Sequence, residues 1–105
     1  MKKVSFSSME RKTMVTIELI GTLRYYVGKA KIQMPMADCL NVIALFRELE
    51  EKYEIPKGLL TEDNSGIKRN LLVLINGREV GVLEGGATLL KSGDRITLLP
   101  VSHGG

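Results

Sequence analysis

The residues best suited to chemistry in this sequence are the two glycines at its end, Gly104 and Gly105. Glycine makes up about 7% of an average protein, so a chance diglycine at this place is expected in roughly 0.5% of chains. A Gly-Gly end has no Cβ atoms and can enter a channel that is too narrow for other residues. Its α-carboxylate is a group on which another protein's active site could act. We therefore expect the chemistry at Gly105, with a frayed glycine end or a cloning remnant as the alternatives.

The residues before the diglycine predict a strand followed by a free tail. Gly93-Asp94 is typical of a turn, and residues 95–99 alternate between polar and apolar side chains, as a half-buried strand does. Pro100 has no N–H group and is expected to end the strand pairing. Residues 101–105 should then project freely over about 17 Å. Such a tail is long enough to enter a deep cleft in a partner.

Composition and charge restrict the class of protein. The chain has 105 residues and one cysteine, and no apolar run approaches a membrane span, which predicts a single cytoplasmic domain that does not bind membranes. Its net charge of +3 lies in residues 1–13, which contain four basic residues and one acidic residue. The remainder is neutral and contains few aromatic residues, so nucleic-acid binding has little support.

The elements that must position the tail follow from the pattern of apolar residues. Residues 1–13 show no periodicity and predict a flexible leader. Within residues 14–100, five strands are predicted: 15–19, 32–34 closed by Pro35, 71–75 entering a hairpin at Asn76-Gly77, 78–80 and 95–99. One short helical turn is expected over residues 87–90. One long helix is expected, with Asn41 favoured over Asp38 as its N-cap and an apolar face made by Val42, Leu45, Phe46, Leu49 and Tyr53. A single helix can cover only one face of a sheet, which predicts an α+β fold, the ubiquitin-like β-grasp, with a mixed sheet wrapped around one main helix.

Four segments of the sequence carry a resemblance to a known family. They are residues 15–24, Asn41-Val42, Leu74-Ile75-Asn76-Gly77 and, most specifically, Leu90-x-x-Gly93-Asp94-x-Ile96-x-Leu98-x-Pro100-x-x-Gly104-Gly105. With these segments, residues 14–105 resemble the small sulfur-carrier proteins of the MoaD and ThiS type, which are similar to ubiquitin.

The resemblance implies a reaction at the end of the chain. In that family an enzyme of the ubiquitin-activating type uses ATP to adenylate the C-terminal glycine, and sulfide from a desulfurase or rhodanese type of donor displaces AMP. Gly105 would then become a thiocarboxylate, and Gly104 would give access to it. The resemblance also implies that the chain is not an enzyme on its own and binds no cofactor, because the activating partner uses the ATP.

The acceptor of the sulfur is less closely specified. The long loop over residues 54–70 resembles the small subunit of molybdopterin synthase, which implies the large subunit of that synthase as a partner and molybdenum cofactor biosynthesis as the role. His103 before the glycines also resembles the ubiquitin-related modifier that serves tRNA thiolation. Three functions stay open: a sulfur carrier, a modifier joined to lysines through Gly105, and a β-grasp binding module with an incidental diglycine.

Other residues with reactive side chains have ordinary interpretations. Cys39 could form a mixed disulfide with a sulfur donor, but a lone cysteine near a helix start is more often a small half-buried side chain. His103 could contact the activating enzyme, and a single histidine cannot make a metal site. Residues 85–92 are glycine-rich but lack the Gly-Lys-Ser/Thr ending of a phosphate loop, which favours a plain turn.

The face of the sheet away from the helix predicts a binding surface. Residues 71–75 are apolar at five consecutive positions, although the helix can bury only one face. If Ile96 and Leu98 point at the helix, then Leu99 points away from it. Exposed apolar patches usually mark interfaces. We therefore expect the partner to bind Leu99, Val101, Ser102 and His103, with a covering loop as the alternative.

Overall fold

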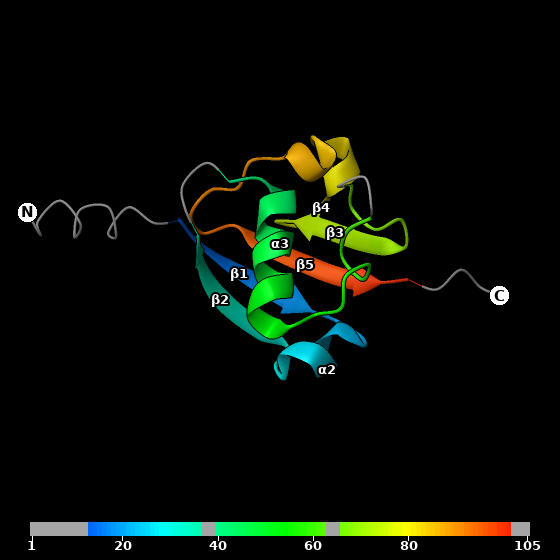
Figure 1. Cartoon of the computed structure of the whole chain (residues 1–105). Helices are drawn as coiled ribbons and strands as arrows, with labels where there is room; N and C mark the ends of the chain where they lie inside the picture. Colours follow the sequence, from blue (N-terminus) through cyan, green and yellow to red (C-terminus); the bar gives the residue numbers. More distant parts are fainter. Residues whose placement is uncertain (1–12, 37–39, 63–65, 102–105) are drawn as a thin grey trace, which may run out of the picture.

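The computed structural model of the chain describes residues 13–36, 40–62 and 66–101. In these residues one long helix lies across one face of a five-stranded sheet (Figure 1). This arrangement confirms the predicted α+β class and the β-grasp architecture. The longest described helix has 12 residues, and no helix in the described ranges has the length and apolar character needed to cross a membrane.

The sheet has the strand order β2-β1-β5-β3-β4. Its elements are β1 (Thr13–Leu19), β2 (Lys31–Met36), β3 (Leu71–Ile75), β4 (Arg78–Glu79) and β5 (Arg95–Pro100). The first and last strands pair in parallel at the centre, and the other pairs are antiparallel. The strand that leads to the C-terminal tail therefore has a neighbour on each side.

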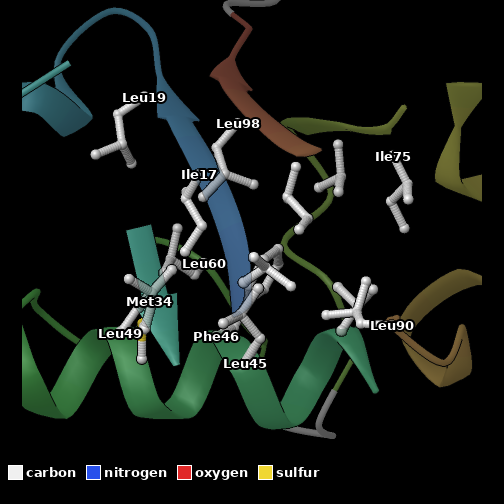
Figure 2. Close-up of a cluster of buried hydrophobic side chains, with 14 of the residues drawn as sticks. Ile17, Leu19, Met34, Leu45, Phe46, Leu49, Leu60, Ile75, Leu90 and Leu98 are labelled. Atoms are coloured by element: carbon white, nitrogen blue, oxygen red, sulfur yellow. The ribbon is translucent and has the colours of Figure 1, made fainter. Parts of the chain in front are cut away.

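The main helix, α3 (Val42–Tyr53), begins at the predicted cap. The side chain of Asn41 accepts a hydrogen bond from the Ala44 N–H at 2.9 Å, which satisfies a backbone donor that has no partner inside the helix. The helix ends at Tyr53, and its C-cap residue Glu54 has a left-handed φ of 53°, before Pro56 is reached. Figure 2 shows Phe46 and Leu49 of α3 directed at the buried side chains of the sheet.

The predicted core is confirmed. Four of the five residues predicted to make the apolar helical face are fully buried: Val42, Leu45, Phe46 and Leu49. They pack with alternate residues of the strands, which are also buried: Val15, Ile17, Leu19, Ile96 and Leu98. The fifth residue of the predicted stripe, Tyr53, is half-buried against this core.

A short helix between the first two strands was not predicted. It is α2 (Leu23–Val27), which ends at Gly28 with a φ of 83°. Five residues are too few to display helical periodicity, and only Leu23 is buried. Figure 1 places α2 at the end of the sheet where β1 finishes.

The predicted element ends also need correction. β2 was expected to close at Pro35 but runs through it to Met36. The Leu19 N–H donates to the Ala30 carbonyl, so every second residue of β2 counted from Ala30 points its backbone N–H at β1. Pro35 lies between two such residues, and its nitrogen therefore faces the open edge of the sheet, where no donor is needed. Val80, expected in a short strand, begins the 3-10 turn η1 (Val80–Val82), and the helical turn expected over 87–90 is η2 (Gly85–Ala87).

Candidate functional site

The predicted reactive residues lie beyond the last described position. Ser102, His103, Gly104 and Gly105 are outside the described residues, as is Cys39. The site is therefore built from the root of the tail, Val101, and from the surfaces around it. From Val101, four further residues can extend about 14 Å.

The root of the tail is held by the sheet for one residue longer than predicted. Pro100 still belongs to β5 and lies opposite Leu71, and the Val101 N–H donates to the Asn70 carbonyl at 2.9 Å. Pro100 does not interrupt this pairing, because its nitrogen faces the β1 side, beyond the end of that strand, where the chain turns away at Gly21. A central strand therefore fixes the direction in which the tail leaves.

Two turns at the start of β5 are joined to one another. Asn76 Nδ2 donates to Asp94 Oδ1 at 2.9 Å, and Asn76 Oδ1 accepts from the Arg95 N–H at 2.9 Å. Asp94 Oδ2 accepts from the Lys91 N–H at 2.7 Å. Asn76-Gly77 and Gly93-Asp94, two of the sequence segments singled out above, thus hold β5 against the hairpin at the end of β3. Their role in the described structure is to position β5.

The outer face of the sheet has an apolar half next to the root of the tail. We define the apolar half as Ile20, Leu72, Leu74, Leu99 and Val101. Leu72 lies opposite Leu99 in the β3–β5 pair, and the Ile20 N–H donates to the Leu98 carbonyl on the other side of β5. Ile20 is 44% exposed and Val101 36% exposed, while the three leucines are half-buried.

The burial pattern confirms the direction predicted for β5. Ile96 and Leu98 are fully buried under α3, and Leu99 lies on the opposite face. The expected binding role of Leu99 and Val101 stays a prediction. Leu99 is half-buried rather than open, because it is flanked by Leu72 and by the end of β1.

The part of the outer face around Glu18 is polar and was not predicted. Glu18 Oε1 accepts a hydrogen bond from Thr97 Oγ1 at 3.2 Å. Glu18 Oε2 lies 3.9 Å from Lys31 Nζ and 3.8 Å from Arg95 Nε. One carboxylate thus faces two cations and a hydroxyl from the two neighbouring strands. The alternation of polar and apolar residues predicted that each of these side chains lies on the surface, but only the register of the paired strands brings the side chains together.

The long connection after α3 is anchored where it is described. Leu60 is fully buried, and the Lys68 N–H donates to the Leu60 carbonyl at 2.8 Å. Thr61 Oγ1 donates to Glu50 Oε2 of the helix at 3.2 Å. Within the described ranges, no group of three or more His, Cys, Asp and Glu residues is arranged to hold a metal ion.

Comparisons with known proteins show which proteins this chain is similar to. The model of the ThiS family matches residues 17–105, a range that includes the diglycine. Small archaeal modifier protein 3 of Haloferax volcanii is 37% identical over 89 residues, which cover 85% of this chain and 96% of that protein. The ubiquitin-related modifier 1 homolog of Caenorhabditis elegans is 32% identical, over 87% of this chain and 95% of that protein. The solution structure of a Haloferax volcanii protein superimposes with a TM-score of 0.81 at 35% identity, covering 90% of this chain and 89% of that one.

Proposed function

The chain belongs to the ThiS family, and from that premise we propose that it carries sulfur as a thiocarboxylate on Gly105. The observation that supports the proposal is the extent of the family match, which runs through the β-grasp to the diglycine. The structure adds a firm root for that tail, since the N–H of Val101 is bonded to the neighbouring strand. As a carrier, the chain would be the substrate of other enzymes rather than an enzyme itself.

The proposed reaction needs two steps on a partner. A carboxylate oxygen of Gly105 attacks the α-phosphorus of ATP, pyrophosphate leaves, and an acyl adenylate forms. In the second step, the persulfide of a desulfurase or rhodanese type of donor attacks the carbonyl carbon and AMP leaves, and a thiol then cleaves the resulting acyl disulfide, which releases the thiocarboxylate and leaves a disulfide. The adenylate supplies the leaving group that a carboxylate lacks, and the absence of side chains at Gly104 and Gly105 lets the carbonyl enter a narrow site.

The apolar half of the outer face is the proposed docking surface for the activating enzyme. It borders the root of the tail, because Leu99 and Val101 belong to the last residues before it. A partner bound there would find Gly105 within about 14 Å of Val101. Ser102 and His103 would then line the path into the partner's site.

The proposed acceptor is a molybdopterin precursor, reached through the large subunit of molybdopterin synthase. Support for this finer assignment comes from the sequence resemblance of the 54–70 loop. A second candidate is protein modification through an amide bond from Gly105 to lysines, or sulfur transfer to tRNA. The second candidate is favoured by the two relatives described above, both of which are named as modifiers.

Mass spectrometry of the chain isolated from its own cells tests the carrier proposal and separates the two candidates. We expect a fraction of the intact chain to carry one sulfur in place of one oxygen, and the variant lacking Gly105 to show no such exchange. A modifier would appear instead on other proteins. Because trypsin cleaves after Arg95, conjugated lysines would bear residues 96–105, a tag that differs from that of ubiquitin.

Two outcomes would change the assignment. Equal sulfur exchange in the variant lacking Gly105 would overturn the carrier proposal. If wild type carries sulfur, incubation of the thiocarboxylate form with a molybdopterin synthase large subunit and the molybdopterin precursor tests the acceptor. Retention of the sulfur in that mixture would contradict molybdopterin as its destination.

A further inference from the structure

A hollow of about 380 Å³ opens beside the apolar half of the outer face. It lies between the end of β1, the short helix α2 and the start of β2. Its lining includes Glu18, Ile20, Gly21, Arg24, Ala30 and Lys31. Ile20 also belongs to the apolar half, so the hollow and the proposed docking surface are continuous. We call it the cationic hollow.

Cationic side chains outnumber carboxylates around this hollow. Lys31 Nζ and Arg95 Nε lie 3.9 and 3.8 Å from the same oxygen of Glu18, so that one carboxylate serves two cations. Arg24 is the second cation of the lining, beside Lys31, and among the described residues it lies in no ion pair. The lining therefore holds two cations and one carboxylate, and Glu18 is shared with Arg95 outside the lining, so the hollow carries an excess of positive charge.

The helix beside the hollow presents side chains suited to recognition. Tyr25 is 81% exposed and Tyr26 45% exposed, and both follow Arg24 directly on α2. Tyrosine and arginine are enriched among the residues that carry most of the binding energy of protein interfaces. α2 also stands near the root of the tail, because a Cβ added to Gly21 would lie 3.7 Å from Pro100 Cδ.

We propose that the cationic hollow receives acidic side chains of the adenylating enzyme that activates Gly105. The inference rests on the proposed function, because it takes that enzyme as the partner. The partner surface would then present carboxylates next to apolar residues, matching the hollow and the apolar half together. Opposite charges at such a border steer encounter and set the register of the docked tail more than they add affinity.

Steady-state adenylation of purified chain variants tests the inference. The double variant Arg24→Glu/Lys31→Glu reverses both lining cations. The control is Lys52→Glu/Lys57→Glu, which changes the net charge by the same amount at exposed positions at and beyond the C-terminal end of α3. We expect the KM for the first variant to rise at least about tenfold, with little change in kcat. The rise of KM with added salt, expected for wild type and control, should be weaker in the reversed variant.

Each outcome is informative. If wild type is adenylated and the two double variants have equal KM values and equal salt dependence, the inference is wrong while the proposed function stands. If wild type is not adenylated at all, the inference and the proposed function are both wrong. Circular dichroism checks the fold, and Arg24→Glu alone, which breaks no ion pair among the described residues, must still raise KM relative to Lys52→Glu.

Discussion

The two faces of the sheet are built from alternate residues of the same strands, but they differ in burial and polarity. On the face covered by α3, Val15, Ile17 and Leu98 are fully buried. On the outer face, Leu99 is half-buried and Glu18 meets cations from its neighbouring strands. One face forms the core, and the other contains the proposed docking surface. Neighbouring positions in β5 should therefore respond to substitution in opposite ways.

Large effects are expected on the covered face. Phe46 lies in the middle of the buried face of α3 and is fully buried, so Phe46→Ala should lower the free energy of unfolding by about 3–5 kcal/mol. Glu51→Ala, at an exposed position on the same helix, should change it by less than about 0.5 kcal/mol. Denaturant unfolding measures both. A loss below about 1 kcal/mol for Phe46→Ala would contradict the assignment of the core.

A matched pair in β5 tests the division between the faces directly. Leu98→Glu should unfold the chain, because it places an unpaired charge in the core. Leu99→Glu should leave a folded chain that the activating enzyme no longer binds, since a charge at a desolvated interface costs several kcal/mol. Circular dichroism and gel filtration with the enzyme separate these results. An unfolded Leu99→Glu variant would show that Leu99 contributes to the core.

The connection between the turns at the start of β5 should have a moderate effect. Asn76→Ala removes the hydrogen bonds to Asp94 and to the Arg95 N–H, and it places alanine at a φ of 53°. We expect a loss of about 1–3 kcal/mol in the free energy of unfolding. Asn76→Gly relieves the backbone strain and should recover part of that loss. Equal stabilities of Asn76→Ala and wild type would remove the structural role given to this segment.

The smallest effect is expected at the polar part of the outer face. Glu18→Gln weakens two ion pairs that are partly exposed to solvent, which should cost less than about 1 kcal/mol of stability. It also frees Lys31 and Arg95, so the KM for adenylation should fall by about two- to threefold, opposite in sign to the effect of Arg24→Glu. Enzyme kinetics at low salt measure this change. A higher KM for Glu18→Gln would argue against acidic groups on the partner.

Local pattern alone was enough to predict much of the fold. The helix after Asn41 and its buried face were predicted from the spacing of Val42, Leu45, Phe46 and Leu49, because a helix of a few turns already shows its periodicity in the sequence. The alternation over 95–99 likewise predicted which side chains of β5 point at the helix. α2 was not predicted, because its five residues bury only Leu23 and show no helical periodicity.

Only the tertiary structure decided which distant residues meet. Glu18 and Thr97 are 79 positions apart, and their hydrogen bond exists because β1 and β5 pair in parallel. Period-two alternation tells which face a side chain occupies, but it carries no information about the neighbouring strand or its register. The chemistry proposed for the tail rests on the last two residues of the sequence, while the apolar half and the cationic hollow arise from segments that the sheet brings together.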